Sequence, residues 1–127
     1  MSRRRAILIV EDDMDLRRML RYALMLDGFD VQEAGDGLDA LRLLDRAVPD
    51  AVILDLGLPV VSGHAVRQEI AAQAHMRHIP VIVVTGQPGP HDSLDVACVL
   101  QKPVSTDQLI RTVRSCIASG GSDVKNS

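Results

Sequence analysis

Short, wholly apolar segments rich in Ile and Val recur along the chain, and they alternate with segments whose apolar residues repeat at helical spacing. A strand that is apolar at every position is covered on both faces, as in parallel sheets with helices on either side. The predicted strands are residues 6–10, 29–33, 51–56, 80–85 and 96–100, of which 29–33 is the more polar and lies nearer an edge. The alternation predicts an α/β fold with a doubly wound parallel sheet and right-handed crossovers.

Helices are predicted between these strands. Leu16, Leu20 and Leu24 share one helical face after the first strand, and Gly28 follows where a left-handed residue ends a helix. Further helices are predicted at residues 38–47, at 63–75 and from Ser105 onward, where Gln108 completes a capping box. Residues 119–127 are Gly, Ser and charged residues with little to bury, so we expect one domain at 4–118 and a flexible tail at 119–127.

Composition excludes several classes of protein. A chain of 127 residues with 46% hydrophobic and 24% charged residues is a single globular domain. A net charge of −3 and 2% aromatic residues argue against direct binding of nucleic acid. No apolar run approaches the roughly 20 residues of a membrane span, and no signal peptide precedes the first strand, so a cytoplasmic protein is expected. Cys98 and Cys116 are expected to remain thiols.

The carboxyl ends of the predicted strands carry the polar residues of interest. In doubly wound sheets, ligands bind beyond these ends. The positions hold Glu11, Asp12 and Asp13 after the first strand, Asp55 at the end of the third, Thr85 at the end of the fourth and Lys102 after the fifth. We therefore expect carboxylates, a hydroxyl and an ammonium group along one edge of the sheet.

Such a group of acids indicates metal-assisted phosphoryl chemistry. Each close pair of carboxylates costs on the order of 4 kcal/mol at an effective dielectric constant near 20. A divalent cation relieves this repulsion, and oxygen-only ligands favour Mg²⁺. Asp55 is then placed to act as a carboxylate nucleophile and form an aspartyl phosphate. Lys102 stabilises charge on the transferred oxygens and Thr85 donates a hydrogen bond.

The same residues, together with the segment Asp55-Leu56-Gly57-Leu58-Pro59 and Gly63, resemble the receiver domain of bacterial two-component response regulators. The resemblance extends from about Ala6 to about Ala118. It implies a flavodoxin-like fold with five strands in the order 2-1-3-4-5. It also implies a cis peptide bond before Pro103.

The resemblance further implies roles for individual residues. Asp55 would take a phosphoryl group from the phosphohistidine of a sensor histidine kinase or phosphotransfer protein. Thr85 and Lys102 would contact that group. The Mg²⁺ ligands would be Asp12, Asp13, Asp55 and the backbone carbonyl of Gly57. Asp13 also lies where a carboxylate favours the helix dipole. The output would act on a separate protein or on an effector domain outside this sequence.

Two departures from the family pattern concern signal output. Val99 stands where the family usually has Tyr or Phe. The segment from Thr85 to Lys102 is shorter than usual and contains Gly86, Pro88, Gly89 and Pro90, which oppose a helix. We therefore expect a shortened or missing fourth helix, and a monomer or weak dimer. We also expect residues 86–95 to become ordered on phosphorylation.

Two alternatives belong to other functional classes. A dehalogenase-type phosphatase needs a second acid two residues after the nucleophile, and Gly57 occupies that position. The chain is therefore expected to catalyse only its own phosphorylation and dephosphorylation. The remaining alternative is a degenerate receiver that binds proteins without phosphorylation. His75 and His78 have a metal-like spacing, but without further nearby ligands they are interpreted as solvated loop residues.

Overall fold

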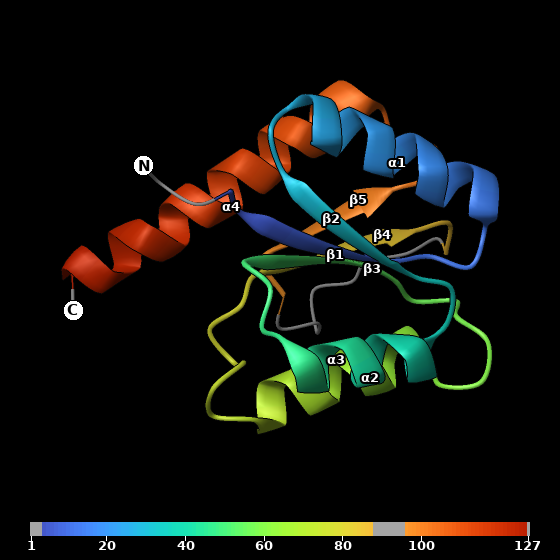
Figure 1. Ribbon diagram of the computed structural model, residues 1–127, viewed down its shortest axis with the longest axis horizontal. Coiled ribbons are helices and arrows are strands. Elements are labelled where there is room, and N and C mark those ends of the chain that lie inside the picture. Colours follow the sequence, from blue (N-terminus) through green and yellow to red (C-terminus); the bar gives the residue numbers. More distant parts are fainter. Residues whose placement is uncertain (1–3, 88–95, 127) are drawn as a thin grey trace.

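Five parallel strands form one sheet in the order β2-β1-β3-β4-β5 (Figure 1). The computed structural model describes residues 4–87 and 96–126, with 119–126 described by backbone alone. The strands are β1 (Ala6–Val10), β2 (Asp30–Ala34), β3 (Ala51–Asp55), β4 (Val81–Thr85) and β5 (Cys98–Gln101). The helices in the described ranges are α1 (Met14–Leu26), α2 (Gly37–Arg46), α3 (Gly63–Ala72) and α4 (Thr106–Asn126). The predicted fold class and strand order are confirmed.

The apolar strands occupy the middle of the sheet, as their sequences predict. All five residues of β3 and all five of β4 are buried, because helices cover both faces of these strands. The register pairs Ile53 of β3 with Ile9 of β1 and with Ile82 of β4. The edge strand β2 alternates between exposed and more buried residues, which agrees with its polar sequence. The three central strands thus form a rigid support for the residues that follow them.

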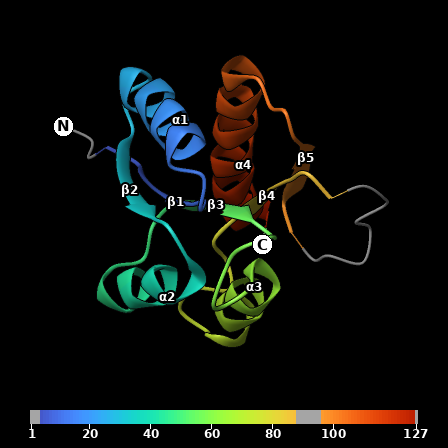
Figure 2. The same cartoon turned by 90° about the vertical axis from the view of Figure 1, so that its right-hand side faces the viewer.

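Helices cover the sheet in two layers, with α1 and α4 on one face and α2 and α3 on the other (Figure 2). Two separate hydrophobic cores result, one on each face. Helix residues that are buried in these cores include Leu20 and Leu24 of α1, Leu109 and Val113 of α4, Ala40 and Leu44 of α2, and Val66 and Ile70 of α3. Free thiols Cys98 and Cys116 pack at the edge of the α1/α4 core.

The predicted ends of two helices are confirmed. Gly28 has a φ of 94°, and its N–H donates to the carbonyl of Met25, while Phe29 N–H donates to the carbonyl of Leu24. This pair of bonds is a Schellman motif, which requires the left-handed residue that glycine supplies. At the start of α4, the Ser105 hydroxyl accepts the N–H of Gln108 at 3.0 Å. Both ends therefore follow from local sequence.

Two features differ from or fall outside the sequence predictions. The helical backbone of α4 continues to Asn126, past residue 118 where the predicted domain ends, and the flexibility predicted for residues 119–127 stays a prediction. Figure 1 shows these last turns extending beyond the sheet, where adding a residue to an existing helix gains a hydrogen bond without needing a buried face.

Residues 86–87 and 96–97 are not helical. Residues 88–95 lie outside the described ranges, as does most of the segment expected to order on phosphorylation. No helix in the described residues is long and apolar enough to cross a membrane.

Candidate functional site

Buried polar side chains gather at the carboxyl ends of the central strands. In the described part of the chain, the buried polar or charged residues are Glu11, Asp55 and Thr85, which are 2%, 6% and 0% exposed. Each stands at or directly after the end of β1, β3 or β4. Ionisable groups are rarely this buried unless they are paired. This edge of the sheet is therefore the candidate site.

Three carboxylates converge there. One oxygen atom each of Glu11, Asp12 and Asp55 lies within 4.8 Å of the others. Glu11 and Asp55 are buried, whereas Asp12 is exposed and opens the cluster to solvent. A set of carboxylate oxygens with one open side suits Mg²⁺, which binds through a few carboxylates and keeps several waters. The donor atoms present therefore fit a magnesium ion.

Asp13 is not part of this cluster, and its predicted role as a metal ligand does not match the geometry. Its Oδ1 accepts the N–H groups of Asp15 at 3.0 Å and Leu16 at 3.1 Å, so Asp13 is the N-cap of α1. The first turn of a helix has N–H groups without intrahelical partners, and an Asp directly before the helix satisfies them. Glu11 takes the third place in the cluster, and the missed signal was this capping preference.

Lys102 connects the carboxylates of β1 and β3. Its Nζ lies 2.9 Å from Oε1 of Glu11 and 3.4 Å from Oδ2 of Asp55. The Lys102 N–H donates to the carbonyl of Thr85 at 2.8 Å, and the peptide bond to Pro103 is cis, as expected. Lys102 is therefore held to the end of β4 while its ammonium group reaches across the site.

The pKa values of the ion pair reflect burial and charge. Burial raises the pKa of Glu11 above its ordinary value, although the hydrogen bonds from Lys102 and from Asp13 N–H act in the opposite direction. Burial alone lowers the pKa of Lys102, but the hydrogen bond and charge of Glu11 and the charge of Asp55 outweigh it, and the pKa is raised. Lys102 is thus a fixed cation at neutral pH.

The loop after β3 fixes the carboxylate of Asp55. Its Oδ1 accepts the N–H of Gly57 at 3.0 Å, and Oδ2 faces Lys102. Gly63 begins α3 directly against this strand end, where an added Cβ would lie 2.2 Å from the carbonyl oxygen of Asp55. Only glycine permits so close an approach. Val60 in the same loop has a φ of 68° and is 82% exposed, a backbone conformation that a β-branched residue rarely adopts.

Thr85 and Val99 lie on the neighbouring strands β4 and β5. The hydroxyl oxygen of Thr85 accepts the N–H of Gln87 at 3.0 Å, so its proton is available to another acceptor. Val99 pairs with Val83 in the sheet and is half-buried against the core formed with α2 and α3. The structure thus brings Asp55, Lys102 and Asp12 into one cluster with Glu11, and Thr85 ends the adjacent strand.

Comparison with known proteins identifies the family. A model of the response regulator receiver domain matches residues 7–114. The sensory transduction protein RegX3 of Mycobacterium tuberculosis is 36% identical over 123 residues, covering 93% of this chain and 53% of that protein. The chain thus spans about half the length of RegX3. The sensor histidine kinase TmoS of Ectopseudomonas mendocina is 35% identical over 117 residues, covering 88% of this chain and 12% of that protein.

Solved structures agree with this result. The receiver domain of a sensor histidine kinase from Pseudomonas aeruginosa has a TM-score of 0.84 and 29% identity, covering 91% of this chain and 99% of that chain. That structure has a magnesium ion coordinated in its active site cleft. The chain belongs to the response regulator receiver domain family of two-component systems.

Proposed function

We propose that Asp55 accepts a phosphoryl group from the phosphohistidine of a sensor histidine kinase or phosphotransfer protein, and that phosphorylation changes the binding of a protein partner. The observation that carries this proposal is the grouping of Asp55 with Glu11, Asp12 and Lys102 at one edge of the sheet. Three acids and one lysine leave an excess of negative charge there, which a bound cation compensates.

Transfer of the phosphoryl group forms one bond and breaks one. A carboxylate oxygen of Asp55 attacks phosphorus and forms an O–P bond. The P–N bond of the phosphohistidine breaks, and its electron pair remains on the imidazole nitrogen. Gly57 N–H and Lys102 hold the two oxygens of Asp55 in position, and Lys102 also neutralises the transferred oxygens. The Thr85 hydroxyl would donate a hydrogen bond to one of these oxygens.

Magnesium fits the same edge. Glu11, Asp12 and Asp55 would hold the ion, and the Gly57 carbonyl would be a further ligand by resemblance to the family. When bound, Mg²⁺ neutralises charge on the phosphoryl oxygens. Attack of water on phosphorus then breaks the bond to the Asp55 oxygen, releases inorganic phosphate and returns Asp55 to its carboxylate form. The chain in this proposal acts only on itself and releases no other product.

Labelling with a small phosphodonor tests the proposal. Wild-type protein incubated with acetyl phosphate and Mg²⁺ should gain the mass of one phosphoryl group. Asp55→Asn and addition of a chelator should each abolish the gain. Asp50→Asn, which changes an acid at the opposite end of β3, is the matched control and should leave labelling intact. Absence of labelling in wild-type protein would instead favour the degenerate receiver, and labelling of the Asp55→Asn variant would remove Asp55 from its assigned role.

A further inference from the structure

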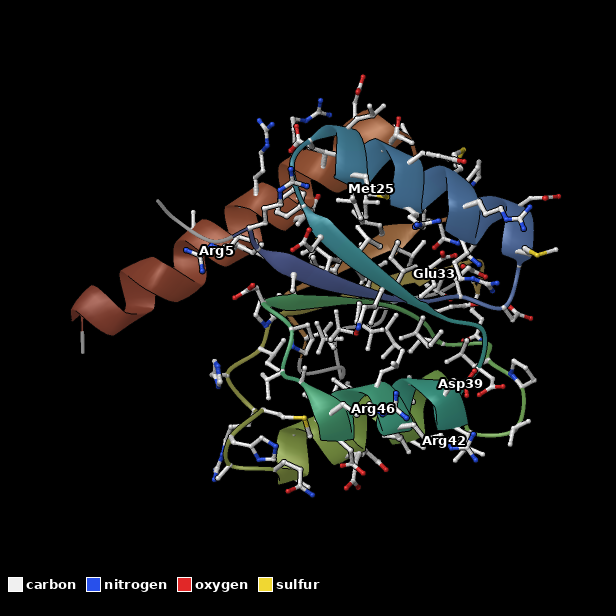
Figure 3. The ribbon with its side chains drawn as sticks, in the orientation of Figure 1. Arg5, Met25, Glu33, Asp39, Arg42 and Arg46 are labelled. Carbon is white, nitrogen blue, oxygen red and sulfur yellow. The ribbon has the colours of Figure 1, made fainter. Side chains whose placement is uncertain are left out.

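Arg17 of α1 contacts the backbone of the candidate site and not its carboxylate groups. Its Nη1 donates to the backbone carbonyl of Glu11 at 2.7 Å, and its Nε donates to Oε1 of Glu33 at 3.1 Å. Glu33 lies on β2 at the side that faces α1 (Figure 3). The guanidinium group therefore ties the loop after β1 to the neighbouring strand. It is 18% exposed, so this bridge is largely shielded from water.

Every polar group of Glu11 is held by a different partner. Its N–H donates to the carbonyl of Ala34 at 3.0 Å, and its carboxylate contacts Lys102 and the N–H of Asp13. The carbonyl is held by Arg17. A buried carbonyl without a partner would cost about 1–3 kcal/mol. Because the peptide bond is planar, fixing this oxygen also fixes the direction in which the chain enters Asp12.

We propose that Arg17 is a positioning residue for Mg²⁺ binding, acting through the backbone of Glu11. The inference rests on the proposed function of the site. Arg17 sets the orientation of the Glu11–Asp12 peptide, and this orientation brings the carboxylates of both residues toward Asp55. Arg17 itself touches neither the ion nor the phosphoryl group.

An arginine suits this task better than a lysine. The guanidinium group presents separate N–H groups in a rigid plane, so Nε and Nη1 bind two acceptors at once. The structure also leaves room for it: a Cβ added at Gly35 would lie 3.3 Å from Nη1 of Arg17. Arg21 supplies a natural comparison, because its Nε lies 3.4 Å from the other oxygen of the same Glu33 carboxylate.

The experiment measures Mg²⁺ affinity of the unphosphorylated protein by isothermal titration calorimetry. Arg17→Gln should weaken binding about tenfold, as is typical when a group that orients metal ligands is removed. Arg17→Lys should recover part of the affinity by donating to the Glu11 carbonyl. Arg21→Gln removes the same charge from the same carboxylate and should change the affinity less than about twofold. In labelling with acetyl phosphate, Arg17→Gln should raise the Mg²⁺ concentration for half-maximal rate more than it lowers the maximal rate.

The sign of the effect separates positioning from general electrostatics. Removing a positive charge near a cation site strengthens cation binding if charge alone matters. Stronger or unchanged binding by Arg17→Gln, or equal losses in Arg17→Gln and Arg21→Gln, would overturn the inference. If Arg17→Gln does not fold, Glu33→Gln must weaken binding more than Arg21→Gln does, and equal values would overturn it. Absence of Mg²⁺ binding in wild-type protein would instead refute the proposed function.

Discussion

Among the described residues, two carboxylates at the amino end of the sheet pair with two arginines, whereas at the carboxyl end three carboxylates cluster and one lysine contacts two of them. Arg4 lies 3.8 Å from Asp30, and Arg5 lies 3.6 Å from Asp50. Figure 3 shows Arg5 at this end of the sheet, on the opposite side from Glu33. At the other end, Glu11 and Asp55 share Lys102, and Asp12 lies beside both of these carboxylates. The two ends thus differ in charge balance.

Burial makes this difference costly at one end only. The side chains of Arg4 and Asp30 are both more than half exposed, and such pairs contribute about 0–1 kcal/mol. Glu11 and Asp55 are buried, so their repulsion is poorly screened. Repulsion between the two carboxylates opposes folding, and Lys102 offsets part of it. The excess of buried negative charge supports the proposal that the carboxyl end would bind a cation, whereas the charges at the amino end are paired with one another.

The largest expected effect comes from removing the lysine of the carboxyl end. Lys102→Met should lower the rate of labelling by acetyl phosphate about 100-fold or more at saturating Mg²⁺, since a preorganised charge on the transferred oxygens is lost. Arg5→Met, which removes a cation from the amino end, should leave the rate within about twofold of wild type. A comparable loss in both variants would show that net charge matters rather than the position of Lys102.

A smaller effect is expected on stability when Mg²⁺ is added. A ligand that binds only the folded state at a hundred times its dissociation constant adds about 2.7 kcal/mol to the free energy of unfolding. The melting temperature should therefore rise with Mg²⁺, and Asp12→Asn should reduce the rise. Asp12→Asn should also stabilise the metal-free protein by removing one repulsion. Asp30→Asn at the amino end is the control and should keep the full response; an equal reduction there would contradict a local site.

The amino end should respond in stability rather than in activity. Asp50 Oδ2 accepts the N–H of Ala6 at 2.7 Å, which fixes the start of β1. Asp50→Ala should lower the free energy of unfolding by about 1–3 kcal/mol, because that N–H loses its acceptor. Asp30→Ala, which breaks an exposed ion pair, should cost less than about 1 kcal/mol. Denaturant titration measures both, and labelling of both variants should remain at the wild-type rate.

The sequence predicts the fold well because the information is local and redundant. Ala6–Val10 and residues 81–84 are apolar throughout, and this pattern predicts that they lie inside a parallel sheet. The sequence predicts Asp55 and Lys102 as members of the site because Asp55 ends one such strand and Lys102 follows another, and parallel strands bring their carboxyl ends together. The parallel topology therefore brings residues that are far apart in the sequence together at one edge of the sheet.

The parts that sequence reasoning missed depend on competition between partners. Glu11 and Asp13 are both acids beside Asp12, and only the structure shows that Asp13 caps α1 while Glu11 turns inward. Val60 adopts a left-handed conformation that its side chain disfavours, so its loop is set by tertiary packing rather than by propensity. The sequence places Arg17 on a helix surface, and it does not show that the side chain donates hydrogen bonds to Glu33 and to the carbonyl of Glu11.

The smallest expected effect is the pH dependence that Glu11 gives to the carboxyl end. Its ordinary pKa is 4.5, and burial raises the pKa in the folded protein while Lys102 remains charged. Between 4.5 and the raised value, the folded state binds more protons than the unfolded state. The contribution of Glu11 to stability is therefore most favourable at low pH and falls as the pH rises through this window.

Denaturant titration in chelator, from pH 4.5 to 8, measures this contribution when wild-type protein is compared with Glu11→Gln. Only the wild type has the Glu11 carboxyl group, so the other titrating groups cancel in the difference. The free energy of unfolding of the wild type minus that of the variant should fall as the pH rises. Saturating Mg²⁺ should reverse the slope, since the metal binds the deprotonated carboxylate. A difference that rises with pH in chelator would mean that the bond to Lys102 outweighs burial, and the carboxyl end would then be as well balanced as the amino end.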